Sequence, residues 1–139
     1  MSPTLITEPA QSYGLSAPNS PTSPKFCRDT VAALLFANDR PDLVDVAKLL
    51  VSEAVTNVNL HTVAPTIRID ATVGRDSVRV TVHDDAPIDH LCLREATTDE
   101  ESGRGLLLVQ ELAYAWGVAW TGGVQPTGKQ IWFELREPA

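Results

Sequence analysis

The sequence predicts a single α+β domain in which helices cover one face of a β-sheet. Two segments, 66–73 and 77–83, alternate strictly between apolar and polar residues, as strands with one buried face do. The preceding segment, 25–61, instead repeats apolar residues at helical spacing. Alternating strands need a second layer over their apolar side, and the helices supply it. We therefore expect a two-layer α/β sandwich, with a mixed, mostly antiparallel sheet and three helices on one face.

Composition excludes several classes of protein. The chain has 139 residues, 43% of them hydrophobic, and a formal net charge of -7. An acidic chain lacks the basic footprint of a general nucleic-acid-binding protein. There is no run of eighteen apolar residues, so no membrane span is expected, and the N-terminus lacks the order of a secretory signal. Cys27 and Cys92 lie in apolar contexts without CxxC spacing, which indicates reduced cysteines and a cytoplasmic protein.

The N-terminal segment is rich in proline, serine and threonine. Five of the ten prolines lie within residues 1–24. Such a segment buries too little apolar surface to offset the entropy lost on ordering. We therefore predict a flexible segment over 1–22 and a folded domain over 23–137. Within the flexible segment, the alternation of Tyr13 and Leu15 is compatible with a short edge strand.

Two helices are expected next. Apolar residues over 25–38 fit an amphipathic helix, which Asn38-Asp39-Arg40-Pro41 ends. Asp42 is the expected N-cap of the second helix, which runs to about His61.

The remaining elements follow from periodicity and turn residues. Gly74-Arg75-Asp76 between the alternating strands predicts a hairpin turn. The polar, irregular segment 84–102 is the long kind of connection that is usually functional. A third helix is expected over 105–115, followed by a hairpin of strands 116–120 and 130–135. The residues expected to face the helices are Ile67, Ile69, Ala71, Val73, Val78, Val80 and Val82, whereas Arg68, Asp70, Arg79 and Thr81 should face solvent.

The second helix carries the first group of candidate functional residues. Glu53, Asn57 and His61 are four residues apart, so they stack along one face of the helix. A carboxylate, an amide and an imidazole flanked by aliphatic residues can line a pocket. A solvated polar face has the same spacing, so spacing alone does not decide between the two interpretations.

Two later motifs add to this group. Gly103-Arg104-Gly105 directly precedes a helix, where backbone N–H groups and the helix dipole favour an anion, although such turns also simply start helices. It is neither a P-loop nor a dinucleotide fingerprint. Asp84 ends a strand, where it can accept hydrogen bonds from a ligand or simply stabilise the turn that follows.

Taken in order, these motifs resemble those of the GHKL, or Bergerat-fold, ATP-binding domains, which include histidine-kinase catalytic domains and gyrase. Within that group the sequence is most similar to the small stand-alone bacterial anti-sigma-factor serine kinases. The resemblance spans roughly residues 25–136. It is carried by the stretches LVSEAVTNVNLHT, VRVTVHDDAP, ESGRGLLLVQELAYAWGV and GKQIWFEL.

The resemblance implies roles for individual residues. Asn57 would coordinate a Mg²⁺ ion that bridges the phosphates of ATP, and Glu53 would act as general base. Asp84 would accept the adenine amino group, with Ala86 beside the base. His61 would lie near the phosphates or cap the helix.

The same resemblance assigns the phosphate-binding loop and the lid. Residues 94–102 would form the ATP lid, and the phosphates would be held by Gly103, Arg104, Gly105 and Leu106. This sequence departs from the family in one place. The usual D-x-G-x-G is replaced by Asp84-Asp85-Ala86-Pro87-Ile88, which contains no glycine. The departure leaves the fold expected and puts ATP affinity in question.

Two functions follow from the resemblance. In the first, the protein is an ATP-dependent serine kinase of an anti-anti-sigma partner, which also sequesters a sigma factor. In the second, it is a non-catalytic module in which nucleotide tunes a protein–protein contact or is not bound. An α+β domain without any nucleotide is a third interpretation. The resemblance also implies a possible homodimer, formed through the first helix and the uncovered face of the sheet.

Overall fold

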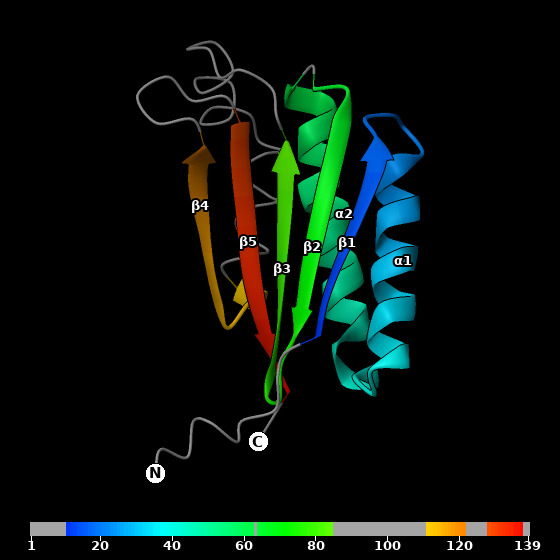
Figure 1. The fold of residues 1–139 in the computed structure, drawn as a ribbon, viewed down its shortest axis with the longest axis vertical. Helices are drawn as coiled ribbons and strands as arrows, with labels where there is room; N and C mark the ends of the chain where they lie inside the picture. The colour runs from blue at the N-terminus through cyan, green and yellow to red at the C-terminus, as the bar shows by residue number, and fades with distance from the viewer. Residues whose placement is uncertain (1–10, 63, 85–110, 122–127, 138–139) are drawn as a thin grey trace.

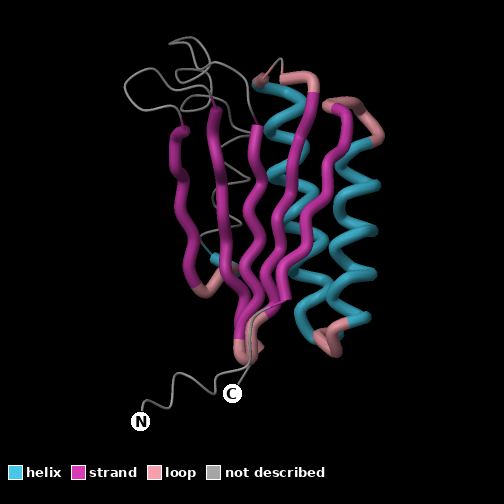
Figure 2. The backbone as a smooth tube through the Cα atoms, in the orientation of Figure 1, coloured by secondary structure: helices cyan, strands magenta, loops and turns pink. Residues whose placement is uncertain are grey.

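The computed structural model describes residues 11–62, 64–84, 111–121 and 128–137. Within them the chain forms one sheet and a layer of helices (Figures 1 and 2). The elements in chain order are β1 (Gln11–Pro18), α1 (Ser23–Ala37), the 3-10 turn η2 (Pro41–Leu43), α2 (Val44–His61), β2 (Thr66–Val73), β3 (Ser77–Asp84), β4 (Ala115–Thr121) and β5 (Gly128–Arg136). No helix among these residues is long and apolar enough to cross a membrane.

The sheet has the strand order β1-β2-β3-β5-β4. Every pair of neighbouring strands in it is antiparallel, so the sheet is wholly antiparallel where a mixed, mostly antiparallel one was expected. The reason lies in the connection between β1 and β2. Helices α1 and α2 run in opposite directions, so the chain returns to the end of the sheet at which it left (Figure 1). A single crossover helix would have made the two strands parallel.

Both helices lie on one face of the sheet, which confirms the two-layer sandwich (Figure 2). The third expected helix, over 105–115, falls largely outside the described residues. Glu111 and Leu112 are helical, but Ala113 and Tyr114 are not. The backbone N–H of Tyr114 already donates to the carbonyl of Glu134, at 2.8 Å. This helix therefore ends before the predicted Ala115, because the chain joins the β4–β5 ladder there.

The predicted inner face of the sheet is the core. All seven apolar residues expected to face the helices on β2 and β3 are buried, whereas Arg68 and Arg79 on the opposite face are exposed. Strand β5 adds Phe133, which is fully buried. Strict alternation therefore identified both the strands and the side that each strand buries. Fully buried side chains from the helices complete the core: Cys27, Val31, Leu35, Leu50, Val51 and Val55.

The helix boundaries differ from prediction at one cap. Helix α1 begins at Ser23 and has a proline in its first turn. Asp39, two residues after the helix ends, has a positive φ of 59°. Asp42 does not cap α2, because it lies inside the 3-10 turn that Pro41 opens. Leu43 is the N-cap residue of α2, and no side chain bonds to this helix end.

The ordered part of the chain begins earlier than residue 23. Strand β1 pairs with β2 along its whole length, from Gln11 opposite Val73 to Pro18 opposite Thr66. Residues 11–22 therefore belong to the folded unit, which corrects the expected boundary of the flexible segment, and the suggested edge strand is confirmed. Pairing at a sheet edge stabilises the segment through backbone hydrogen bonds and so needs few apolar side chains. Residues 1–10 lie outside the described residues.

Candidate functional site

The C-terminal ends of α2 and β3 lie at the same end of the molecule (Figure 1). Strand β4 also ends there, and β5 begins there. This end therefore gathers Glu53 and Asn57 from the second half of α2 and Asp84 from the last position of β3. The two sequence segments that carry these residues are about thirty residues apart, and the helix–sheet packing brings them to one edge.

Asp84 is the buried acid of this end. Only 4% of its surface is exposed. It lies opposite Ile67 on β2 and Lys129 on β5, and on the helix-facing side of the sheet because Ile67 is a core residue. A buried carboxylate is costly unless it is paired, and Asp84 does have interaction partners. A buried, partnered carboxylate of this kind is typical of functional sites and of structural ion pairs.

Lys129 is a further candidate residue, which the sequence analysis did not include. Directly opposed residues of antiparallel strands have their Cβ atoms about 5 Å apart. The register therefore places an ammonium-bearing side chain beside Asp84, and Lys129 is itself half-buried. Gly128-Lys129 was visible in the sequence as part of the last hairpin. Only the strand register shows that the lysine faces the acid.

Glu53 and Asn57 lie one turn apart on α2, and both side chains are half-buried. Their neighbours Ala54 and Val58 are buried in the core and anchor the helix. Within the described part of the chain, no hydrogen bond or ion pair engages either polar side chain. An amide and a carboxylate are therefore held one turn apart on a well-packed helix, without a partner among the described residues. His61 ends the helix, and its side chain lies outside what is described.

Several predicted site residues fall outside the described residues. These are Ala86, the lid segment 94–102, and the glycine-loop residues Gly103, Arg104, Gly105 and Leu106. Their roles remain predictions.

The residues present fit a nucleotide-bound Mg²⁺ ion. No group of three His, Cys, Asp or Glu side chains that could hold a metal by itself occurs among the described residues. Mg²⁺ that is bound together with phosphates needs only one or two protein ligands, because phosphate oxygens and water fill the other positions. The amide oxygen of Asn57 is a suitable ligand of this kind. Bound in this way, the ion would neutralise charge on the phosphates.

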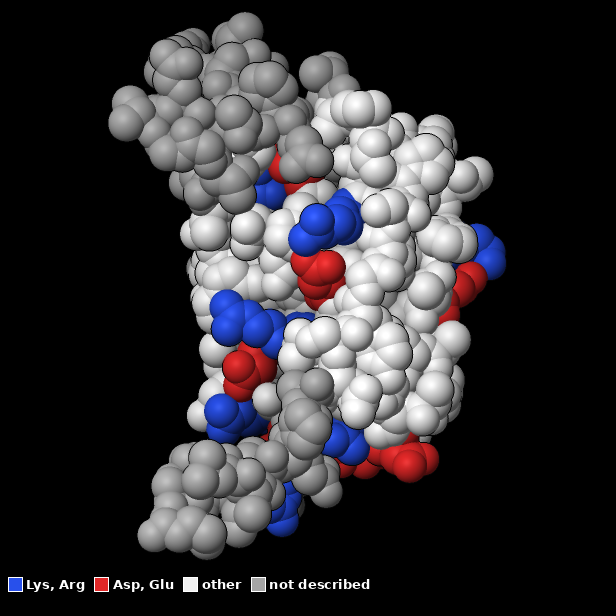
Figure 3. Space-filling view, viewed as in Figure 1, with Lys and Arg blue, Asp and Glu red and all other residues white. Residues whose placement is uncertain are grey.

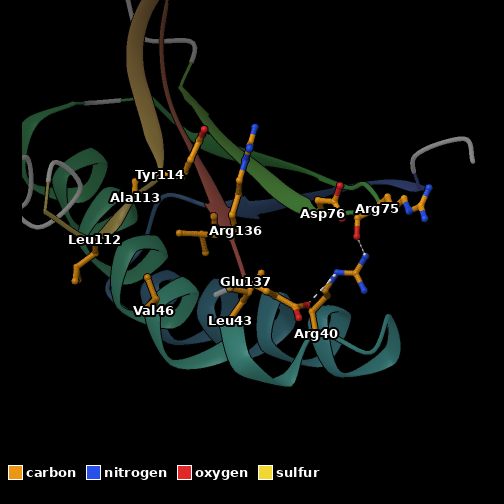
Figure 4. A pocket seen from close by; sticks show the side chains of 11 residues that line it. Arg40, Leu43, Val46, Arg75, Asp76, Leu112, Ala113, Tyr114, Arg136 and Glu137 are labelled. Carbon is orange, nitrogen blue, oxygen red and sulfur yellow. Dashed lines mark hydrogen bonds and ion pairs between the residues drawn. The ribbon is translucent and has the colours of Figure 1, made fainter. Parts of the chain in front are cut away.

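A cavity at the opposite end of the molecule is not this site (Figure 4). It has a volume of about 790 Å³ and contains none of the predicted site residues. Arg40 at its rim is occupied by structural contacts. Its Nη2 donates to the carbonyls of Gly74 and Arg75, at 2.6 and 3.0 Å, and its Nε lies 3.5 Å from Glu137. These bonds tie the α1–α2 corner to the β2–β3 hairpin.

The face of the sheet that the helices leave uncovered carries charged side chains of both signs. Figure 3 shows basic and acidic side chains interspersed down this face. Arg79 stacks on the ring of Trp132, with 3.9 Å between the guanidinium carbon and the ring centroid. Asp70 accepts from Arg68 at 3.0 Å and contacts His83 Nε2 at 2.8 Å. The charges are largely paired with one another, so this face carries no strong field of one sign.

Comparison with known proteins identifies a family. The family model of the histidine kinase-like ATPase domain matches residues 18–134. The match runs from the end of β1 into β5 and includes Glu53, Asn57 and Asp84. A search of curated proteins found no match.

Proposed function

Since this chain belongs to the histidine kinase-like ATPase family, we propose that it is an ATP-binding regulatory protein of the anti-sigma-factor serine/threonine kinase type. It would phosphorylate an anti-anti-sigma partner, sequester a sigma factor, or do both, in the cytoplasm. The observation that carries the proposal is the buried Asp84 at the end of the sheet where α2 presents Glu53 and Asn57. The similarity of the motifs to the stand-alone kinases supports the finer assignment.

Each residue has a role that its position allows. Asp84 accepts a hydrogen bond from the exocyclic amine of adenine, which guanine cannot donate from the same position. Asn57 holds the Mg²⁺ ion of Mg-ATP through its amide oxygen. Glu53, one turn earlier on the same helix, accepts the proton of the attacking serine hydroxyl. Lys129 lies opposite Asp84 in the strand register and brings a positive charge to the adenine end of the site.

A non-catalytic binding module is the second candidate function. The absence of glycine from Asp84-Asp85-Ala86-Pro87-Ile88 favours it, because glycines let the backbone approach a bound base closely. Glu53 favours the kinase, because a module that only binds nucleotide needs no general base. In either case the outcome depends on a protein partner.

Two exposed surfaces are suited to such partners or to a second copy of the chain. Helix α1 exposes Phe26 and Phe36, at 53% and 60% of their surfaces. The uncovered sheet face offers the stacked pair of Arg79 and Trp132. We place the homodimer interface on these two surfaces. Sedimentation of the wild-type protein beside a Phe26→Ser, Phe36→Ser variant tests this, and a monomeric wild type would contradict it.

Phosphoryl transfer is the experiment that separates the two candidate functions. Wild-type protein, radiolabelled ATP and a purified candidate anti-anti-sigma protein should give a phosphoserine on the partner. Glu53→Ala should lose the transfer but keep ATP affinity, because the residue touches the hydroxyl and not the base. Glu111→Ala, which changes an exposed glutamate elsewhere, is the matched control and should behave as wild type. Tight ATP binding by a wild-type protein that transfers nothing would exclude the kinase and leave the binding module.

A further inference from the structure

Two chain corners are joined by hydrogen bonds at the end of the molecule that carries the candidate site. The first corner links β1 to α1, and the second links α2 to β2. The Asn19 backbone N–H donates to the Pro65 carbonyl at 3.0 Å, and the Asn19 Nδ2 donates to the Ala64 carbonyl at 2.8 Å. In the opposite direction, Asn59 Nδ2 donates to the Ser20 carbonyl at 3.0 Å. We call this set of contacts the asparagine clamp.

The end of α2 is closed by Thr62 and is also held by the clamp. Both the backbone N–H and the hydroxyl of Thr62 donate to the Val58 carbonyl, at 3.1 and 3.0 Å, and so close the helix. Asn59 lies in this last part of the helix, only two residues after Asn57. Two residues correspond to about 200° around a helix, so the clamp holds α2 from the side opposite to Asn57. The clamp therefore holds the helix without engaging the amide of Asn57.

The same clamp also reaches the strand pair that carries Asp84. Strand β2 begins at Thr66, directly after the Pro65 carbonyl that Asn19 binds. Its second residue, Ile67, is the register partner of Asp84 on β3. The helix of Asn57 and the strand neighbour of Asp84 are thus attached to one corner, residues 19–20.

Asn59 retains a group that stability alone does not favour. Its Oδ1 is buried and accepts no hydrogen bond from any described residue. A buried acceptor without a partner costs free energy, and an apolar side chain of the same size would avoid that cost. What Asn59 contributes is the bond from its Nδ2 to the Ser20 carbonyl, which an apolar side chain of the same size could not make.

We propose that Asn19 and Asn59 are positioning residues, which fix the distance between Asn57 and Asp84 so that one Mg-ATP molecule engages both. The inference rests on the proposed function, in which Asn57 holds the Mg²⁺ ion and Asp84 holds adenine. A small misplacement of a group that positions a substrate can have a large effect. The clamp can therefore affect nucleotide binding without touching the nucleotide.

The test measures ATP affinity twice, with Mg²⁺ and with EDTA. Affinity in EDTA reports mainly on adenine and phosphate contacts, and the gain on adding Mg²⁺ reports on Asn57. Asn19→Ala and Asn59→Leu should each reduce the Mg²⁺-dependent gain about tenfold, while affinity in EDTA changes little. Asn38→Ala is the matched control, because its Nδ2 donates to the Leu34 carbonyl at 2.8 Å at the far end of α1. This variant should leave the gain unchanged.

A second readout keeps the clamp testable on its own. Amide hydrogen exchange of residues 58–61 should be faster in both clamp variants and unchanged in Asn38→Ala. An unchanged Mg²⁺-dependent gain in both variants, in a wild-type protein that binds Mg-ATP, would overturn the positioning role. Unchanged exchange would overturn the clamp itself. If the wild-type protein binds no ATP while both clamp variants show the faster exchange, the proposed function and the positioning role are both refuted, and the clamp stands as a structural contact only.

Discussion

Replacing Gly117 by alanine should destabilise the protein, although alanine ordinarily suits a strand better than glycine. Gly117 lies opposite Trp132 on the uncovered face of the sheet, and the indole lies over it. A Cβ atom at this position would lie 2.6 Å from Trp132 Nε1 and 2.8 Å from Cε2 and Cζ2. These distances are far below van der Waals contact, so the ring must leave β4 and lose its stacking with Arg79.

The expected magnitude follows from three contributions. Overpacking costs about 1–3 kcal/mol, and the lost cation–π contact about 0.5–1 kcal/mol. Alanine in place of glycine restricts the unfolded chain, which stabilises the folded state by about 0.4–1 kcal/mol. The net loss is therefore about 0.5–3.5 kcal/mol, which corresponds to a fall in Tm of roughly 2–12 °C for a chain of this length.

Thermal unfolding followed by circular dichroism measures this loss. Gly14→Ala is the matched control on the other edge strand, where the new Cβ would meet only Asp70 Oδ1, at 3.3 Å. That variant should be as stable as wild type or slightly more stable. In a Trp132→Ala background, Gly117→Ala should cost nothing. The reasoning is refuted if Gly117→Ala alone leaves Tm unchanged, or if its cost persists without the indole.

Three further predictions concern stability and binding. Burial raises the pKa of the Cys27 thiol from its ordinary value near 9 to about 11. Between these values the unfolded chain ionises first and holds fewer protons than the folded one. The free energy of unfolding should therefore fall as pH rises from about 9 to 11. Urea unfolding at several pH values measures this, and an identical pH slope in Cys27→Ala would contradict it. Arg40→Lys should cost about 1–2 kcal/mol in thermal unfolding, because an ammonium cannot reproduce the fork that bonds the Gly74 and Arg75 carbonyls, and ATP affinity should not change. Asp84→Asn should lower ATP affinity and reduce the preference over GTP about tenfold or more, and equal affinities in calorimetry would place adenine elsewhere.

Much of the sheet could be predicted because its strands bury one face. In β2 and β3 the alternation of apolar and polar residues determines which side of each strand faces the helices, and all seven inward residues are buried. Strand β1 was harder, because its order depends on backbone pairing with β2 and not on apolar content. The antiparallel arrangement of β1 and β2 depends on two helices that reverse the chain between them, which no local pattern encodes.

The residues of the candidate site likewise differ in whether a local sequence pattern indicates them. Glu53, Asn57 and Asp84 were singled out by local signals, namely helical spacing and a carboxylate at a strand end, and the family resemblance assigned their roles, which stay predictions. Lys129 was not found, because its position opposite Asp84 is set by the register of two strands that are distant in sequence. The asparagine clamp was not found either. Its bonds join residues about forty positions apart and end on backbone carbonyls, which leave no pattern in the sequence.

The central claim is that Asn57 and Asp84 form two ends of one nucleotide site. Calorimetric titration of the purified protein with Mg-ATP, Mg-ADP and Mg-GTP, repeated on Asn57→Ala, tests it most directly. We predict binding that is selective for adenine nucleotides and that is lost in Asn57→Ala. Absence of binding by the wild-type protein, or nucleotide affinity that is unchanged in Asn57→Ala, would contradict the claim.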